Sequence, residues 1–186
     1  MSLTNAQTAD FLRSAFGGES MAHMRYLAWA EHALKNGYPN IGRLYQAIAH
    51  AEQVHAHNHF KVLKDRTGGF LVASGGEFGL HGVADNLTWA IEGELGEVNQ
   101  MYPAYMAVAE LQGEKEAMRS FHYALEAEKI HADMFAQARD YAKAEKDMPI
   151  GEDKIYICPV CGFTHIGTPP DSCPVCKVKK DLFLAF

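Results

Sequence analysis

The chain has 186 residues, 48% of them hydrophobic and 22% charged, with a formal net charge of -6. This composition excludes a disordered or fibrous protein, and the negative charge excludes a basic nucleic-acid surface. No apolar run reaches the roughly 18 residues of a membrane helix, and the first ten residues lack a signal-peptide pattern. We therefore expect a cytoplasmic protein without nucleic-acid or membrane partners.

Four long helices are predicted, in chain order, over residues 5–35, 40–66, 85–112 and 114–146. Apolar residues recur at helical spacing, and glycine or proline marks the breaks, as in NGYPN at 36–40 and at Gly113. Asp85 is the expected N-cap of the third helix, and Pro103 inside that helix predicts a kink or bulge near residues 98–102.

The second and third helices are joined by residues 67–84, which hold six glycines. A connection of this length is unusual unless it crosses from one end of a bundle to the other. We therefore expect a mainly α protein with a ferritin-like four-helix bundle over residues 1–147. The linker is expected at 148–154 and a small C-terminal domain at 155–186.

The C-terminal segment contains all four cysteines, Cys158, Cys161, Cys173 and Cys176, in the spacing C-x2-C-x11-C-x2-C. A segment this short needs a metal or disulfides to fold, and the two CPVC knuckles are typical of a four-thiolate metal site in a reducing compartment. The spacing alone does not distinguish an iron centre that carries electrons from a structural zinc ribbon.

Glutamate and histidine are paired three residues apart on the second helix and on the fourth, as Glu52 with His55 and Glu128 with His131. Residues at this spacing share one helical face, so each pair can present an oxygen and a nitrogen to one point. The other two helices add inward carboxylates, namely Glu19, Glu94 and Glu97. Di-iron carboxylate bundles use this division of ligands, and hard oxygens with imidazole suit iron or manganese.

The stretch AHAEQVHAHNHF at 49–60 holds four histidines. Only His55 lies three residues after Glu52, the spacing expected of a metal ligand. His50 and His57 point to other faces and are expected in solvent, whereas His59 lies one turn beyond His55 and stays open as a neighbour of the site or a core residue. The remaining helical glutamates are expected as surface charges: Glu31, Glu92, Glu110, Glu114, Glu116 and Glu126.

The whole chain resembles the rubrerythrin family, in which a ferritin-like di-iron bundle is fused to a rubredoxin-like domain. The resemblance lies in GES at 18–20, RY at 25–26, AEQVHA at 51–56, GELGEVNQMYP at 93–103, EAEKIHA at 126–132 and both knuckles. Lys177 departs from the pattern, since a small residue often follows the second knuckle.

The resemblance implies a role for each site residue. Glu52 and Glu128 would bridge two irons, with Glu94 and His131 on one iron and Glu19 on the other. That second iron would exchange Glu97 for His55 on reduction. Tyr26 and Tyr102 match tyrosines that hydrogen-bond the ligating carboxylates, and the cysteines would hold iron as Fe(Cys)4, with zinc as a possible substitute.

The resemblance also implies a peroxidase of oxidative stress defence that reduces hydrogen peroxide to water. Electrons would pass from NAD(P)H through a partner reductase or rubredoxin to the Fe(Cys)4 centre. The resemblance implies a head-to-tail homodimer in which the cysteine centre of one subunit faces the di-iron site of the other. The glycine-rich crossover also allows helices to be exchanged between subunits, although it could equally close within one chain. Two alternatives stay open: a ferroxidase or iron-handling protein with a structural tail, and a structural or sensor protein with zinc at the cysteines.

Overall fold

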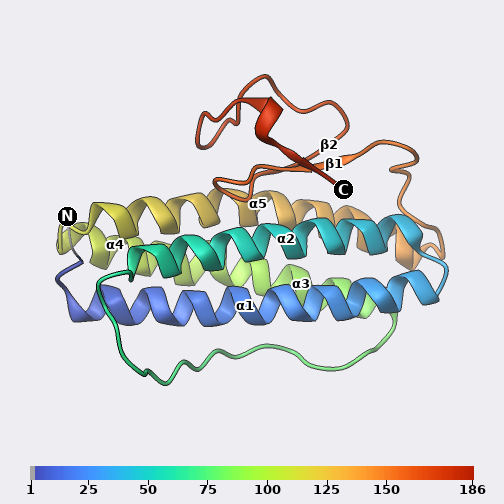
Figure 1. The fold of residues 1–186 in the computed structure, drawn as a ribbon. Coiled ribbons are helices and arrows are strands. Elements are labelled where there is room, and N and C mark those ends of the chain that lie inside the picture. Colours follow the sequence, from blue (N-terminus) through green and yellow to red (C-terminus); the bar gives the residue numbers. More distant parts are fainter. Residues whose placement is uncertain (1–2) are drawn as a thin grey trace.

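The computed structural model describes residues 3–186 and confirms a mainly helical bundle with a small C-terminal domain (Figure 1). The third helical segment is built from three consecutive elements rather than one. The helices are α1 (Ala6–Lys35), α2 (Pro39–Val62), α3 (Val83–Gly96), the π-helix η1 (Glu97–Met101), α4 (Tyr102–Leu111) and α5 (Lys115–Lys143). Among the described residues, no helix combines the length and apolarity required to cross a membrane.

The crossover between α2 and α3 runs along the outer side of α1, as Figure 1 shows. The guanidinium of Arg13 lies 3.6 Å above the ring centroid of Phe70. Further along, the Trp29 indole N–H donates to the carbonyl of Gly79 at 2.9 Å. These contacts fasten a segment that has no helix or strand of its own to the bundle.

The predicted irregularity in the third segment is confirmed as the π-helix η1, which directly precedes α4. Pro103 lies in the first turn of α4 and has no backbone N–H, so the α-helical ladder cannot continue unbroken through it. The predicted cap at Asp85 is wrong, because α3 begins at Val83 with Gly82 as its N-cap. Asp85 instead places a negative charge in the first turn, where the helix dipole favours it.

Two helix starts are held by carboxylates from distant parts of the chain. Glu114 was expected in solvent, but it is half-buried and its Oε1 accepts the backbone N–H groups of Thr4 and Asn5, both at 2.9 Å. Asp147 accepts the N–H groups of Asn40 at 2.8 Å and Ile41 at 3.1 Å. First-turn N–H groups have no partner within their own helix, so Asp147 satisfies those of α2, whereas Glu114 binds the two residues that directly precede α1.

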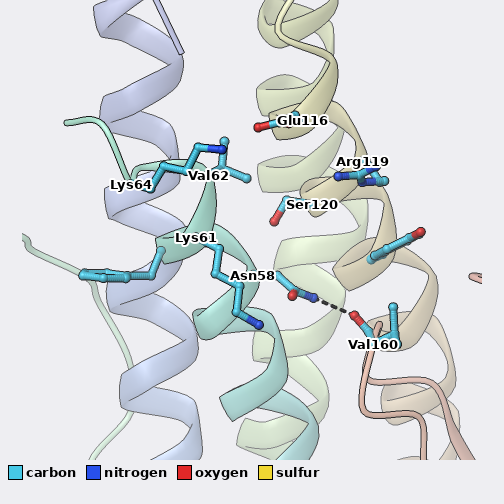
Figure 2. A pocket seen from close by; sticks show the side chains of 10 residues that line it. Asn58, Lys61, Val62, Lys64, Glu116, Arg119, Ser120 and Val160 are labelled. Atoms are coloured by element: carbon cyan, nitrogen blue, oxygen red, sulfur yellow. Dashed lines mark hydrogen bonds between the residues drawn. The ribbon is translucent and has the colours of Figure 1, made fainter. Parts of the chain in front are cut away.

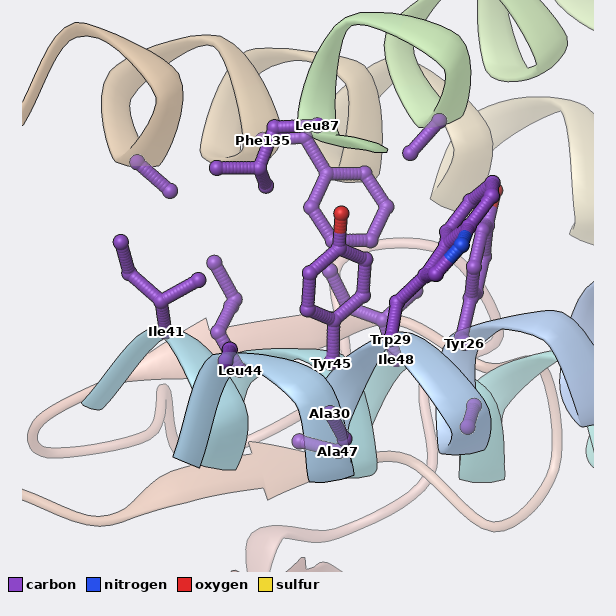
Figure 3. Close-up of a cluster of buried hydrophobic side chains, with 14 of the residues drawn as sticks. Tyr26, Trp29, Ala30, Ile41, Leu44, Tyr45, Ala47, Ile48, Leu87 and Phe135 are labelled. Carbon is purple, nitrogen blue, oxygen red and sulfur yellow. The ribbon is translucent and has the colours of Figure 1, made fainter. Parts of the chain in front are cut away.

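The apolar core forms two clusters that are separated by the polar side chains of the bundle centre. The first cluster is shown in Figure 3 and includes Tyr26, Trp29, Ile41, Leu44, Tyr45, Ile48, Leu87 and Phe135. The second includes Leu12, Ala15, Tyr102, Ala117, Phe121 and Ala124. Along α1 and α5, the glutamates predicted as ligands fall between the two clusters, so both ends of the bundle hold the polar layer in place.

The C-terminal domain is a three-stranded antiparallel sheet of order β2-β1-β3, with strands β1 (Ile155–Ile157), β2 (Thr164–Ile166) and β3 (Leu184–Ala185) and the short 3-10 helix η2 (Lys180–Leu182). Tyr156 pairs with His165 on one side and with Ala185 on the other. The segment before β1 is packed rather than loose, since Met148 and Ile150 are buried. The domain lies over α2 and α5 (Figure 1).

Candidate metal centres

The bundle centre gathers six of the predicted ligands into two overlapping groups. In each group, one ligand atom from every residue lies within 4.8 Å of the others. The first group is Glu19, Glu52, His55 and Glu128, and the second is Glu52, Glu94, Glu128 and His131. Glu52 and Glu128 belong to both groups, which is the arrangement expected of carboxylates that bridge two metal ions.

Local helical geometry explains the pairing inside each Glu-x-x-His sequence. The Nδ1 atom of His55 lies 2.8 Å from Glu52 Oε2, and Nδ1 of His131 lies 2.7 Å from Glu128 Oε2. Residues three apart sit one above the other on a helix face. Because α2 and α5 turn these faces toward each other, His55 Nδ1 also comes within 2.7 Å of Glu128 Oε1.

The cluster is buried and carries more negative charge than its histidines can balance. All six side chains are at most 2% exposed. Each of the four glutamates leaves one oxygen without a hydrogen bond of acceptable geometry, namely Glu19 Oε2, Glu52 Oε1, Glu94 Oε2 and Glu128 Oε1. Buried carboxylates without partners cost several kcal/mol each. The carboxylate oxygens and the two imidazoles together form a donor set that fits two metal ions.

The mutual repulsion of the glutamates is visible in their acidity in the absence of metal. Burial and the neighbouring charge of Glu52 raise the pKa of Glu128 to about 8. Burial and the charges of Glu128 and Glu52 also raise the pKa of Glu94 well above its usual value. Burial acts in the same direction on Glu19, but hydrogen bonds from His55 and His59 outweigh it and lower the pKa. Cations would replace the protons that this cluster otherwise retains.

Glu97 lies apart from both groups. It is half-buried in η1, and its Oε1 is 3.7 Å from the position that a Cβ on Gly18 would occupy. It lines a crevice of about 400 Å³ between α1, the crossover and η1, together with Arg25 and Met101. In this structure His55 is therefore a member of the first group and Glu97 is not.

Two buried tyrosines orient the outer carboxylates. The Tyr26 hydroxyl donates to Glu94 Oε1 at 2.5 Å, and the Tyr102 hydroxyl donates to Glu19 Oε1. Burial and the nearby carboxylates raise the pKa of both phenols well above the usual value, so both remain hydrogen-bond donors. Partners of this kind fix the direction in which a ligating oxygen points.

The histidine-rich stretch of α2 separates into different environments. His57 is exposed, as expected, whereas His50 is half-buried with its ring 5.2 Å from that of Phe186, which the sequence did not indicate. His59 is completely buried and hydrogen-bonded to Ser120 and Tyr102. The position of His59 on the His55 stripe signalled its burial, but no sequence pattern pointed to Ser120.

The four cysteines form a third group, with Sγ atoms of Cys158 and Cys176, and of Cys161 and Cys173, 3.4 Å apart. A hydrogen bond from the Cys161 thiol lowers the pKa of Cys158 to about 5, while burial raises the pKa of Cys176 to about 12. A bound metal ion would hold all of them as thiolates.

The two knuckles have the same backbone form despite different residues after the second cysteine of each. Gly162 has φ +79° and its N–H donates to the carbonyl of Cys158 at 3.0 Å. Lys177 has φ +67° and its N–H donates to the carbonyl of Cys173, also at 3.0 Å. The departure at Lys177 therefore leaves the turn intact.

The first knuckle contacts the dimetal cluster directly. His55 Nε2 lies 3.2 Å from the carbonyl oxygen of Cys161, and His131 Nε2 lies 2.9 Å from Thr164 Oγ1. Asn58 adds a hydrogen bond to the carbonyl of Val160 at 2.8 Å. One backbone carbonyl and one imidazole thus join the thiolate group to the carboxylate group within a single chain.

A four-helix bundle around shared glutamates and two histidines, with a tetrathiolate domain docked on it, defines a di-iron carboxylate protein with an attached Fe(Cys)4 domain. The family described as Rubrerythrin matches residues 10–139, and the description "Rubrerythrin, rubredoxin-like domain" matches residues 156–184. The chain belongs to the rubrerythrin family, whose members are generally peroxidases of oxidative stress defence. Its ferritin-like fold and both kinds of metal centre are confirmed by this match and by the donor groups.

The relatives match over the full length. Rubrerythrin-2 of Clostridium acetobutylicum is 60% identical, with 100% of both chains covered. Nigerythrin of Nitratidesulfovibrio vulgaris is 32% identical over 96% of this chain and 86% of its own length. A solved structure of nigerythrin in its fully reduced, all-ferrous state superposes with a TM-score of 0.86 at 32% identity, covering 100% of this chain and 89% of that one.

Proposed function

We propose that this protein is a non-haem di-iron peroxidase that reduces hydrogen peroxide to water, with electrons that come from NAD(P)H through a reductase or rubredoxin. The observation that supports this most strongly is the contact between Cys161 and His55, which connects a tetrathiolate site to a dimetal site. A centre that is oxidised in every turnover must be reduced again, and an attached Fe(Cys)4 group supplies that need.

The proposed ligands follow from the two groups. Glu52 and Glu128 would be shared by the two irons, Glu94 and His131 would complete one site, and Glu19 with His55 would complete the other. Glu97 would replace His55 on oxidation. Cys158, Cys161, Cys173 and Cys176 hold the Fe(Cys)4 iron. Residues 1–147 form the di-iron domain, 148–154 the linker and 155–186 the electron-transfer domain.

Bound iron would supply the two electrons that convert peroxide to water. The protein's own residues bind, orient and protect that chemistry. Tyr26 and Tyr102 hold Glu94 and Glu19 by hydrogen bonds, and the burial of the cluster excludes bulk water. The carbonyl of Cys161 fixes the His55 ring in a single orientation, because it accepts from Nε2.

The proposal extends to the cellular context. We place the protein in the cytoplasm as a homodimer, in line with the family pattern. The contacts of Cys161 and Thr164 with the cluster histidines of the same chain support electron transfer within one subunit, beside the transfer between subunits that the family pattern implies.

The decisive test is Cys158→Ser. The variant should lose NAD(P)H-driven peroxide consumption in a reconstituted system, because the Fe(Cys)4 relay is broken. It should keep one stoichiometric oxidation of the reduced dimetal site by peroxide. Loss of that single oxidation, with iron content of the bundle unchanged, would contradict the division of labour between the two centres. Lys177→Ala, a substitution in the same domain that removes no ligand, serves as the control.

A further inference from the structure

His59 is a fully buried imidazole that belongs to neither metal group. It is 0% exposed and packs its ring 5.5 Å from that of Phe121. Its Nδ1 lies 2.8 Å from Ser120 Oγ and its Nε2 lies 3.1 Å from Tyr102 Oη. An aliphatic pair would fill this space without any polar group to desolvate, so the buried imidazole and hydroxyl require an explanation of their own.

The hydrogen bonds of His59 continue to the dimetal cluster. Tyr102 Oη donates to Glu19 Oε1, and the other oxygen of that carboxylate, Oε2, lies 3.8 Å from His55 Nδ1 on the cluster side. An unbroken series of three hydrogen bonds therefore runs from Ser120 on α5 through His59 on α2 and Tyr102 on α4 to Glu19 on α1.

The outer end of this series reaches a cavity of about 690 Å³ on the surface of the bundle. Figure 2 shows Ser120 between the α2 and α5 walls of this cavity, beside Arg119 and across from Lys61, with Val160 of the docked domain at one end. Ser120 is only 5% exposed, so it forms part of the wall that separates solvent from the buried imidazole.

We propose that Ser120, His59 and Tyr102 form a proton-uptake path from this cavity to Glu19. The inference rests on the proposed function, since reduction of one hydrogen peroxide to two waters consumes two electrons and two protons. The cluster is buried in the bundle, and this path supplies those protons without admitting water to it.

Each transfer keeps the path neutral. Water in the cavity gives a proton to Ser120 Oγ as the hydroxyl proton passes to His59 Nδ1. His59 releases its Nε2 proton to Tyr102 Oη, which gives its own proton to Glu19 Oε1. One proton enters and one reaches the carboxylate, which passes it to an oxygen of the departing water and can then accept the next. Hydroxyl rotation with exchange of the imidazole tautomer resets the path.

The residue types suit this role. A hydroxyl donates and accepts at the same oxygen, and a neutral imidazole donates at one nitrogen while it accepts at the other. Glutamine at position 59 could make both hydrogen bonds as well, but an amide does not exchange tautomers readily. The structural role of His59 and its transfer role can therefore be separated by substitution.

The test uses Ser120→Val and Ser120→Thr, two variants of nearly equal shape that differ in the hydroxyl, together with His59→Gln. The first readout needs no turnover. NMR of the full-length, zinc-loaded protein measures how fast the His59 imidazole N–H proton exchanges with solvent. We expect exchange at least about tenfold slower in Ser120→Val than in Ser120→Thr, in line with the usual size of acid–base effects, with amide exchange of α2 unchanged.

The second readout is single-turnover oxidation of the iron-loaded, reduced protein by hydrogen peroxide in H2O and D2O. Ser120→Val and His59→Gln should both be slowed by about tenfold or more with an enlarged solvent isotope effect, while Ser120→Thr stays close to the parent.

Equal imidazole exchange in the two Ser120 variants would overturn the path whatever the peroxide rates are. A full rate in His59→Gln would show a structural role only and would also overturn it. If the parent itself fails to react with peroxide, the proposed function is lost, and the exchange measurement still decides the path. Should Ser120→Val fold poorly, His59→Gln decides the question by its single-turnover rate and solvent isotope effect, where a full rate would overturn the path.

Discussion

Gly162→Ala tests the contact between the first knuckle and the dimetal cluster. A Cβ at position 162 would lie 2.1 Å from His55 Nε2 and 2.8 Å from the adjacent ring carbon. The knuckle and the imidazole must separate by more than about 1 Å to restore an ordinary van der Waals contact. That movement would stretch the 3.2 Å contact between His55 and the Cys161 carbonyl beyond hydrogen-bonding distance.

The size of the effect follows from the bond that is lost. A hydrogen bond of this kind contributes about 1 kcal/mol, and residual crowding adds to the loss, so the equilibrium constant for docking should fall by about tenfold. Alanine at positive φ costs a further 1–2 kcal/mol, roughly, within the knuckle itself. Lys177→Ala is the control, because it places alanine at a similar φ of +67° in the equivalent turn of the second knuckle.

The assay follows electron transfer between the two centres after one equivalent of peroxide has oxidised the reduced dimetal site. The visible colour of ferric tetrathiolate should return about tenfold more slowly in Gly162→Ala than in the parent, and at the parental rate in Lys177→Ala. Hydrogen exchange of α2 around His55 should rise in Gly162→Ala alone. Equal transfer rates and equal exchange in both variants would refute the reasoning that this glycine permits the contact.

Three further outcomes are expected. Glu97→Ala should slow peroxide turnover while both irons stay bound, as checked by metal analysis, and an unchanged rate would make the carboxylate exchange irrelevant. Tyr45→Phe should raise the free energy of unfolding by about 1 kcal/mol, because the Tyr45 hydroxyl is buried without a hydrogen-bond partner. Tyr26→Phe should lower the free energy of unfolding by about 1–3 kcal/mol, because Glu94 Oε1 loses its hydrogen-bond donor. The pKa of Glu128 rises from 4.5 to about 8 on folding, so its contribution to the stability of the metal-free protein is present below pH 4.5 and is lost as the pH rises to 8. Denaturant titrations at pH 5 and pH 8 should show this loss of stability, and bound metal should abolish the difference.

The parts of the site that could be predicted from the sequence are those that one helix determines by itself. The spacing of Glu52 with His55, and of Glu128 with His131, fixes a shared helical face before any tertiary contact forms. Pro103 likewise predicts an irregularity in its helix, which the structure contains as the π-helix η1, since a residue without an N–H interrupts the hydrogen-bond ladder wherever it falls.

The parts that could not be predicted depend on pairings between distant segments. Ser120 meets His59 from 61 positions away, and Glu114 reaches the backbone of Asn5 from 109 positions away. No periodicity signals such contacts, because the helical pattern of each segment places a side chain on a face and does not identify the distant residue that meets it. The same holds for the docking of Cys161 on His55, which depends on the path of the chain after α5 rather than on either motif.

The central claim is tested most directly by anaerobic titration of the fully reduced, iron-loaded protein with hydrogen peroxide and, separately, with O2. The account predicts that peroxide oxidises the dimetal site faster than O2 does, with one peroxide consumed per site, and that a red ferric tetrathiolate spectrum develops once the Fe(Cys)4 iron is oxidised. Faster oxidation by O2, accumulation of a ferric mineral, or a colourless cysteine site filled by zinc would contradict it.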